Sequence, residues 1–437
     1  MLAAGSLTDP SGEGLRLVEL AIREAMHRVG GGLLEELLGV DLGHRGQRLD
    51  CGRGHQAEFI SYRTKAVDSV LGEVAVRRAY YHCEQCEHGF CPRDRELGIE
   101  GSSLSPGMLR MVCRTGSDEP FGEARRDLKD LAGVELTIKR IERATEAAGE
   151  SVRLGAEQES DGIVSGQILS ALRAEAVPKL YITLDGTGVP TVPKENQGRR
   201  GKGPDGRAHT REVKLGCIFT QTQLDEQGNP VRDPDSSTYA FSLENAERFG
   251  ALLYAEARTR GLERAAEVIV IGDGAPWIWN LAAEHFPGAT QICDLYHSRE
   301  HLNDLAKQVL AVGGIEDGRT WVTARHDELD RGAIDDLLLA LLDTPAAKAN
   351  AEVRKAVAYF DTNCERMRYG RFRAAAMFVG SGVVEAGCKS VVHRRLKQSG
   401  MRWTVRGAAS VISLRCQQAS GRWEAIWQWA RTQTNAA

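Results

Sequence analysis

The sequence predicts a mixed α/β domain over residues 176–437, preceded by three smaller segments. Two apolar runs, KLYITLDG and VIVIGDG, have the length and composition of buried strands. Helical segments such as PWIWNLAAEHF alternate with strands, and the stretches EVKLGCIFTQTQ and STYAFSL add further strands after the first run. Strands that alternate with helices after an initial antiparallel run indicate the α/β class.

The composition is that of a globular protein with two to three domains. The chain has 437 residues, of which 42% are hydrophobic and 27% charged. No apolar run approaches the roughly 18 to 20 residues that span a bilayer, and the start MLAAGSLTDPSGEG lacks the basic and apolar regions of an export signal. We therefore expect a cytoplasmic protein without a membrane partner.

Residues 1–45 are expected to form an N-terminal helical segment. Its apolar positions recur at helical spacing: Leu15, Val18, Leu20, Ala21 and Ala25. Three consecutive glycines, Gly30 to Gly32, should interrupt this helix.

Residues 46–100 predict a zinc-ribbon-like segment. Cys83 and Cys86 form a Cys-x-x-Cys knuckle, and Cys51 with His55 supplies the other half. Three cysteines and a histidine suit a structural, tetrahedral Zn²⁺.

Two alternatives remain open for this cysteine cluster. His88 or Cys91 would replace His55 as the fourth ligand, or the thiols would stay reduced without a metal. The remaining cysteines occur singly in mostly apolar surroundings and are expected to be reduced core residues: Cys113, Cys217, Cys293, Cys364, Cys388 and Cys416.

Residues 101–155 predict a helix-turn-helix-like DNA-binding region. The pattern is helical on both sides of a turn at Gly133, and the second helix carries Lys139, Arg140 and Arg143. The alternative is a pair of helices that only pack a core.

Three acidic residues are the candidates for catalysis. Asp185 and Asp273 follow the two buried strands, where side chains of an α/β sheet face a crevice. Glu385 lies one turn into a helix that begins after Gly380, and the four-residue spacing places Lys389, Val392 and Leu396 on the same face. An aspartate at a strand end otherwise only opens a turn.

Such carboxylates would form a site for two divalent ions. Two strands and a helix would bring the three acids together around Mg²⁺ or Mn²⁺. Two ions about 3.5 to 4 Å apart activate a water or a 3′-hydroxyl at a phosphodiester and stabilise the leaving oxygen.

Two basic segments flank the candidate catalytic acids in the sequence. They indicate contacts with DNA phosphates. The alternative is that each segment forms a solvated charged face. The first contains Lys194, Arg199, Arg200, Lys202, Arg207, Arg211 and Lys214. The second contains Lys389, Arg394, Arg395, Lys397, Arg402 and Arg406. Trp403 would stack on an unpaired base or pack in the core. The net charge of −4 does not exclude DNA, because a local basic surface suffices.

Four motifs, in order, resemble the DDE transposases of bacterial insertion sequences of the ISKra-type family. They are LDGTGVP around Asp185, IGDGAPWIW around Asp273, DLYHSREHL, and VEAGCKSVVHRRLKQSGMRW around Glu385. The resemblance covers the chain from about residue 45 onwards. It implies an RNase H-like catalytic domain over 176–437, with an all-helical insertion at about 298–378.

The resemblance also implies an activity and its partners. Asp185, Asp273 and Glu385 occupy the positions of the metal ligands, and the activity is cleavage of transposon ends with joining of the 3′-hydroxyl to target DNA. A homodimer or higher homo-oligomer and association with the nucleoid follow from the same resemblance. Cys51 and His55 depart from the family's usual first pair, which is two cysteines.

Asp294 and His297 fit an aspartate-x-x-histidine signature of related transposase groups. His297 would then contact DNA or hold the scissile phosphate. The alternative is that both residues only cap the helix that follows.

Two other functions remain open. A transposase relic would bind DNA as a repressor through the zinc and helix-turn-helix segments without catalysis. An RNase H-like nuclease would cleave DNA without strand transfer.

Overall fold

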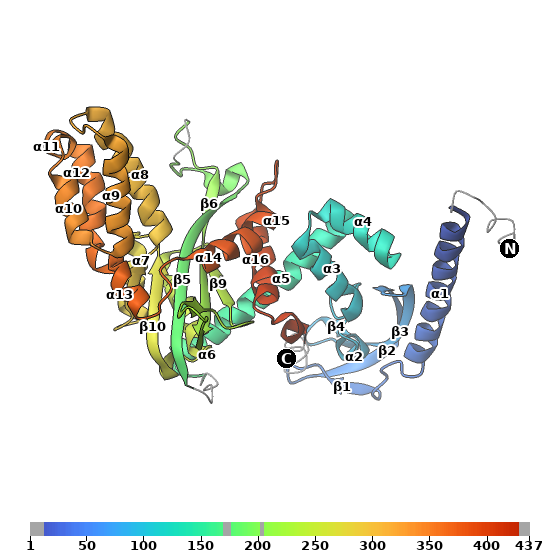
Figure 1. Ribbon diagram of the computed structural model, residues 1–437. Coiled ribbons are helices and arrows are strands. Elements are labelled where there is room, and N and C mark those ends of the chain that lie inside the picture. The colour runs from blue at the N-terminus through green and yellow to red at the C-terminus, as the bar shows by residue number, and fades with distance from the viewer. Residues whose placement is uncertain (1–12, 169–175, 202–204, 428–437) are drawn as a thin grey trace. The chain divides into compact units, whose positions relative to one another are not determined.

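The chain forms two units, each with its own sheet (Figure 1). The computed structural model describes residues 13–168, 176–201 and 205–427. Unit 1 comprises Met1–Ala148 and Trp423–Ala437, and unit 2 comprises Gly149–Arg422. The division falls inside helix α5, Ile138–Val164, so this helix continues past the predicted segment boundary at residue 155.

Unit 1 contains an antiparallel sheet in the order β1-β2-β3-β4. The strands are β1 Arg48–Asp50, β2 Gln56–Ser69, β3 Gly72–Cys83 and β4 His88–Phe90. β2 and β3 form a long hairpin, and the alternation of buried side chains in β3 changes phase between Val76 and Ala79.

Helix α1, Glu13–Gly39, packs on β3. The prediction that Gly30 to Gly32 interrupt this helix is wrong, because α1 runs through all three. Two of these glycines allow a close approach: a Cβ on Gly30 would lie 3.2 Å from Leu71 Cδ1, and one on Gly31 would lie 3.4 Å from the Leu71 carbonyl oxygen. Contact with the hairpin therefore offsets the poor helix propensity of glycine.

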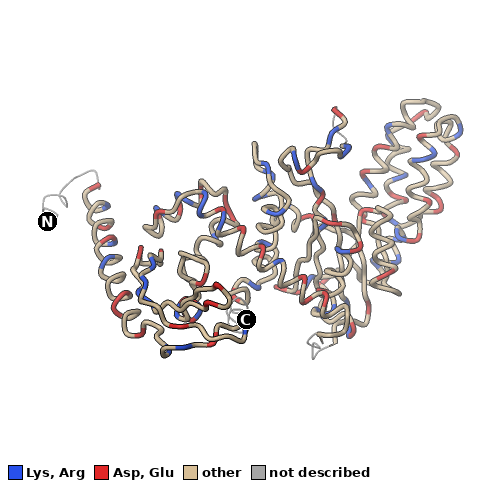
Figure 2. The backbone as a smooth tube through the Cα atoms, turned by 180° about the vertical axis from the view of Figure 1, so that it is seen from behind, with Lys and Arg blue, Asp and Glu red and all other residues tan. Residues whose placement is uncertain are grey.

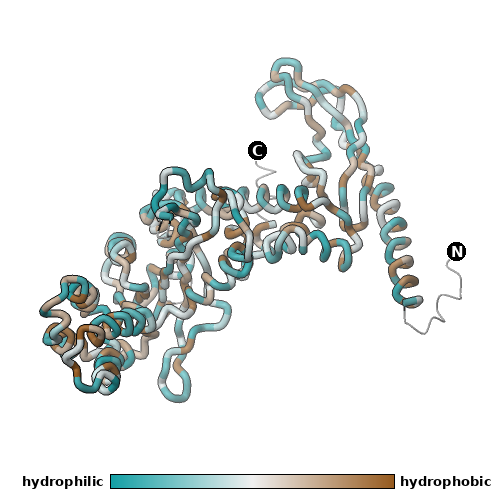
Figure 3. The backbone as a smooth tube through the Cα atoms, turned by 90° about the horizontal axis from the view of Figure 1, so that it is seen from above, coloured by the Kyte–Doolittle hydropathy of each residue, from teal (hydrophilic) through white to brown (hydrophobic). Residues whose placement is uncertain are grey.

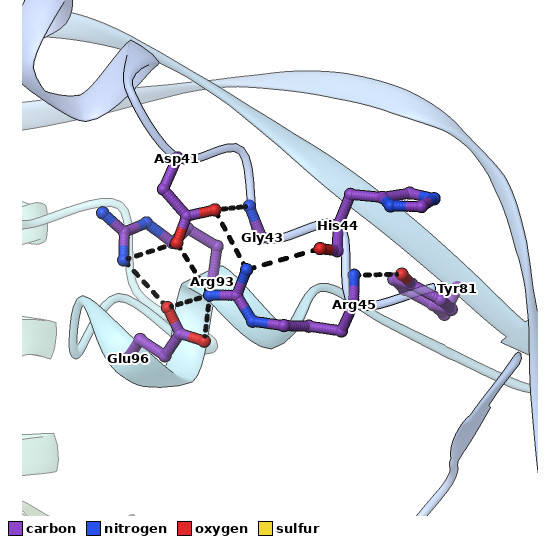
Figure 4. A network of polar contacts seen from close by, with 7 residues as sticks. All are labelled: Asp41, Gly43, His44, Arg45, Tyr81, Arg93 and Glu96. Atoms are coloured by element: carbon purple, nitrogen blue, oxygen red, sulfur yellow. Dashed lines mark hydrogen bonds and ion pairs between the residues drawn. The ribbon is translucent and has the colours of Figure 1, made fainter. Parts of the chain in front are cut away.

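A network of ion pairs fixes the segment that follows α1 (Figure 4). Arg45 pairs with Asp41 and Glu96 at 2.8 Å each, and Arg93 pairs with Glu96 at 2.8 Å. Hydrogen bonds from Arg45 lower the pKa of Asp41 well below its usual range. The network joins this segment to helix α2, Pro92–Glu96.

The predicted helix-turn-helix outline is present in unit 1. Helices α3 Pro106–Asp118 and α4 Phe121–Ala132 precede α5. Gly133 ends α4 with a positive φ of 68°, which glycine adopts without strain. One buried core joins the three helices: Leu104, Met108, Val112, Ala124, Leu128, Val134, Leu136 and Ile141. DNA binding by this region stays a prediction.

Unit 2 contains a mixed five-stranded sheet in the order β11-β10-β5-β6-β9. The strands are β5 Val177–Pro190, β6 Thr210–Gln221, β9 Thr238–Ser242, β10 Ala265–Gly272 and β11 Thr290–Cys293. β5, β6 and β9 are antiparallel, whereas β10 and β11 join the other side of β5 in parallel. A small hairpin, β7 Gln223–Leu224 and β8 Pro230–Val231, follows β6.

Helices cover both faces of this sheet. A Cβ on Gly216 of β6 would lie 2.4 Å from Leu253 of α6, Ala246–Thr259. The neighbouring residue Leu215 contacts α14, Gly382–Gly387. Since successive residues of a strand point to opposite faces, α6 and α14 lie on opposite faces of the sheet. Helix α7, Pro276–His285, packs beside α6, and α16, Val405–Ala419, packs on β9.

Every element between β11 and α14 is helical, as the sequence predicts for this stretch. The main helices are α8 Leu295–Val312, α9 Gly318–Arg331, α10 Ile334–Leu342, α11 Pro345–Ala349, α12 Ala351–Thr362 and α13 Tyr369–Ala374. They stand together at one end of unit 2 in Figure 1. The strand predicted from TQICDLYH ends at Cys293, because Asp294 caps α8.

The last predicted helix is interrupted by a π-helical turn, Cys388–His393, between α14 and α15, Arg394–Leu396. The single face predicted from Glu385 through Lys389 to Val392 is therefore wrong: Lys389 is exposed, whereas Val392 is buried. A π turn adds a residue to the turn and shifts the face that follows it.

Charged residues of both signs are distributed along both units (Figure 2). None of the helices within the described residues has the length and apolarity that crossing a membrane requires.

Substitution of Gly216 tests the close contact between β6 and α6. Gly216→Val forces bulk against Leu253, and overpacking of this kind costs about 1 to 3 kcal/mol. We expect a lower melting temperature of unit 2. Gly382→Ala is the control, because no atom lies within 4 Å of a Cβ there. Equal melting temperatures for the two variants would contradict this packing.

Candidate active site and candidate metal centre

The two candidate aspartates lie at equivalent positions on adjacent parallel strands. The last pair between β5 and β10 is Thr183 with Ile271, so Asp185 and Asp273 each follow by two residues. Neighbouring strands lie about 4.8 Å apart, and residues two positions along a strand point to the same face. Both aspartates therefore come at the carboxyl end of this strand pair, Asp185 within β5 and Asp273 directly after β10.

Asp185 lies within β5 rather than at its end, which corrects the sequence prediction. β5 continues to Pro190 because its pairing with β6 extends to Thr210, beyond the point where pairing with β10 stops. The carboxylate is half-buried, and its Oδ1 accepts a hydrogen bond of 2.7 Å from the amide of Gly186. Asp273 does follow its strand, and its Oδ1 accepts a 2.9 Å bond from the amide of Ala275.

The helix that carries Glu385 packs on β5 and β6. A Cβ on Gly387 would lie 3.4 Å from Leu215, which is the register partner of Asp185. Burial raises the pKa of the Cys388 thiol, as do the charge of Asp185 and a hydrogen bond to it. Glu385 is half-buried on α14, three residues before Cys388, which begins the π-helical turn.

A buried aspartate connects the sheet to the start of α14. Asp294 is fully buried, and its amide donates to the carbonyl of Gly272 at 2.8 Å. Its Oδ1 accepts from the amide of His297 at 2.8 Å, and its Oδ2 accepts from the amide of Ser381. Ser381 Oγ lies 3.4 Å from Glu385 Oε1. Asp294 is thus the N-cap of α8 and positions the residues that precede Glu385.

An aromatic pair that the sequence did not identify lies beside Asp273. The Tyr359 hydroxyl donates to the Asp273 carbonyl oxygen at 3.0 Å, and the His301 ring stacks on Tyr359 with centroids 4.0 Å apart. Burial lowers the pKa of His301. Both residues come from the helical insertion, where no spacing in the sequence related them to the aspartate.

A polar group lies beside Asp185 as well. The Thr187 hydroxyl is 2.7 Å from His393 Nε2 and accepts a hydrogen bond of 2.7 Å from Lys397 Nζ. Burial lowers the pKa of both His393 and Lys397. Lys397 was predicted to contact DNA, and here it is half-buried next to the acid.

The three carboxylates are not close enough in this structure to form a single-ion site. Among the described residues, one group of His, Cys, Asp or Glu ligands meets that condition, and it lies elsewhere, in unit 1. Rotation about side-chain bonds changes the separation of carboxylates. The roles of Asp185, Asp273 and Glu385 therefore stay predictions that the backbone register supports.

The residues predicted to bind zinc in unit 1 lie close together in the structure. The ligand atoms of Cys51, His55, Cys83 and Cys86 all lie within 4.8 Å of one another. Cys51 Sγ is 3.7 Å from Cys86 Sγ, and His55 Nδ1 is 3.1 Å from Cys86 Sγ. Tetrahedral Zn²⁺ with Zn–S bonds of about 2.3 Å separates its sulfur ligands by about 3.8 Å. The cluster fits a metal ion such as zinc.

His55 is the residue that completes the group, because neither His88 nor Cys91 belongs to it. Burial, together with hydrogen bonds to Cys83 and Cys51, raises the pKa of the Cys86 thiol to about 11. A metal ion would bind the thiolates and displace these protons. The hairpin β2–β3 brings the two halves of the site together, since β1 pairs with β2 and Cys83 ends β3.

Three of the predicted DNA-contacting residues are internal instead. Arg395 is fully buried and lies over the Trp403 ring, 4.8 Å from its centroid. The Trp403 indole is also buried and donates to the Leu396 carbonyl at 3.2 Å, so it packs in the core. Lys214 is buried with its Nζ 2.9 Å from Glu212. These side chains are enclosed by their own fold and do not face solvent.

The two basic segments meet at a cavity of about 640 Å³ in unit 2. Its basic lining comes from both segments: Lys194, Arg199, Arg207, His209 and Arg402. Backbone hydrogen bonds explain the meeting, because Trp403 donates to Pro190 and accepts from Val192 at 3.0 and 2.9 Å. Arg200, Lys389 and Arg394 are exposed, whereas Lys202 lies outside the described residues.

The basic residues on α5 and α8 are partly engaged. Arg140 forms an ion pair with Asp68 and also bonds to Ser103, so it joins α5 to the rest of unit 1. Lys139 is exposed and pairs with Glu142 at 2.6 Å. His297 Nδ1 is 3.3 Å from Glu300. Contacts of these residues with DNA stay predictions.

No protein-family model and no curated protein sequence matches the chain. A function for the chain is therefore inferred from the residues and geometry described above.

Asp294→Asn tests the positioning role of this buried carboxylate. An amide offers one acceptor oxygen to the two backbone N–H groups that the carboxylate satisfies, so about 1.5 to 3 kcal/mol of unfolding free energy should be lost. Asp317→Asn is the matched control, since Asp317 caps α9 but is exposed. Thermal unfolding measures the loss of unfolding free energy in both variants. A loss in Asp294→Asn that is no larger than the loss in Asp317→Asn would contradict the positioning role of Asp294.

Cys83→Ser tests the metal centre. We expect purified chain to contain about one zinc per molecule and the variant to contain none, with earlier melting of unit 1. Cys91→Ser should retain the metal, because Cys91 lies outside the cluster. Elemental analysis measures both. Zinc loss in the Cys91 variant alone would assign the ligands differently.

Proposed function

We propose that this chain is a metal-dependent DNA transposase with an RNase H-like catalytic domain. One observation carries the proposal: Asp185 and Asp273 each come two residues after the last paired residues of the parallel strands β5 and β10, and α14 with Glu385 packs on β5. Separate parts of the chain thus bring three acids to one region of the sheet.

The architecture of unit 2 supports the RNase H-like assignment. Three consecutive antiparallel strands are followed by two that join the first strand in parallel, which agrees with that fold. The helical insertion lies between β11 and α14, where the resemblance to ISKra-type transposases expects one.

The three carboxylates would hold Mg²⁺ or Mn²⁺. When bound, two such ions activate a water or a 3′-hydroxyl and stabilise the leaving oxygen of a phosphodiester. Lys397, whose Nζ donates to Thr187 two residues after Asp185, would contact the scissile phosphate. Asp294 keeps Glu385 aligned, and His297 at the start of α8 is the proposed contact with DNA next to the acids.

DNA is the proposed partner, as transposon ends and as target. The cavity lined by Lys194, Arg199 and Arg402 concentrates positive charge near the continuation of β5, where phosphates of bound DNA would lie. The α4–α5 helices of unit 1 would bind the transposon ends, and the metal centre of that unit would be structural. Cytoplasmic location with association to the nucleoid belongs to the same proposal.

Removal of one carboxylate at a time tests the catalytic assignment. Asp185→Asn, Asp273→Asn and Glu385→Gln should each lower Mn²⁺-dependent cleavage of transposon-end DNA by well over about 100-fold, because each removes a metal ligand. Binding of the same DNA should persist. Retained cleavage in any variant would remove that residue from the site.

Glu267→Gln is the matched control, since Glu267 lies on β10 six residues before Asp273 and is exposed. The same assay separates the alternative functions. A chain that binds ends without cleavage would be a DNA-binding relic, and one that cleaves without joining 3′-ends to target DNA would be a nuclease.

A further inference from the structure

Helix α1 carries a continuous stripe of exposed apolar side chains. The exposed fractions are Leu15 56%, Ile22 56%, Met26 60%, Val29 65%, Leu33 57% and Leu37 61%. At 100° per residue, these six positions fall within an arc of about 80°. The stripe therefore runs along nearly the whole 27-residue helix on one side.

A second side of α1, about 80° to 140° around the helix from the centre of the stripe, already has its partner within unit 1. Leu34 and Leu38 pack against the core of the small sheet, and Arg23 donates to the Asp130 carbonyl at 2.9 Å. In Figures 1 and 3, no described element of unit 1 covers the outer side of α1. The helix thus has two apolar faces, and unit 1 covers one of them.

The area of the stripe is large for an uncovered surface. Six side chains that each expose on the order of 80 Å² give about 500 Å² of apolar surface, near the upper limit for a monomer. Two such stripes together would bury about 1,000 Å², which reaches the lower limit of a specific protein interface.

We propose that α1 pairs with α1 of a second copy of this chain as a short coiled coil. Ile22, Met26, Val29 and Leu33 are spaced by four, three and four residues, the repeat that places apolar side chains on one seam between two helices. Next to the seam, Gly32 leaves room for a close neighbour, because no atom lies within 4 Å of a Cβ there.

The charge of α1 favours a second copy over a lipid surface. The helix contains five glutamates and three arginines, and no lysine. Helices that lie on anionic membranes carry an excess of Lys and Arg on the polar face, which α1 lacks. The pairing does not depend on the proposed transposase activity, although two paired copies would hold two DNA ends near each other.

Sedimentation velocity of the full chain without DNA tests the pairing. Wild type should sediment as a dimer in the micromolar range, and Val29→Glu with Leu33→Glu should sediment as the 47.8 kDa monomer. Leu17→Glu is the matched control: Leu17 is 48% exposed on the same helix but lies outside the stripe, so this variant should remain dimeric. Circular dichroism and zinc content confirm that the variants are folded.

Cysteine crosslinking gives a second, independent measurement. Met26 lies at the centre of the stripe, so Met26→Cys should form an intermolecular disulfide whether the helices run parallel or antiparallel. Arg28→Cys, outside the stripe, should not. The proposal is overturned if wild type is monomeric, if the double variant stays dimeric, or if wild-type monomer binds anionic vesicles through this face. If the wild type is a monomer and the double variant melts at a lower temperature, the stripe packs against another part of the same chain instead.

Discussion

The candidate site depends on one buried charge. Asp294 lies at 0% exposure between the end of β11, the start of α8 and the residues before α14, and two backbone amides satisfy its carboxylate. A carboxylate without such donors would be expensive to bury. Because its partners come from positions 297 and 381, the entire helical insertion can extend away from the sheet while its two ends remain together. The same connection holds Ser381, which lies directly before α14 and four residues before Glu385.

Much of the fold could be predicted from the sequence because local patterns determine it. Strand β10 and helices α6 and α7 lie where apolar periodicity indicates, and the Cys-x-x-Cys knuckle lies at the end of a hairpin strand. Asp185 and Asp273 could be selected as candidates for the same reason, since in the sequence an acid and a glycine follow each apolar run. Their mutual register, in contrast, is a property of strand pairing, and no local pattern contains it.

The errors have a common physical origin in tertiary contact. Gly30 to Gly32 look like helix breakers, but the approach of Leu71 compensates their low propensity. Arg395 lies in a basic segment of the sequence, which suggested a contact with DNA. In the fold, however, its side chain is enclosed against Trp403. Residues such as Tyr359 and His301 reach Asp273 from the distant insertion. Only the folded chain shows which neighbours a side chain has.

The π-helical turn at Cys388–His393 divides the last helix into two parts with different constraints. The part before it is fixed by contacts with β5 and β6, and the part after it is fixed by the buried Arg395 and Leu396. The extra residue in the turn allows each part of the helix to keep the orientation that its own contacts require. Loss of a single residue here would restore a regular helix and rotate one part by about 100°. An insertion or deletion in this stretch would therefore disturb the packing of one part of the helix even if every remaining side chain were unchanged.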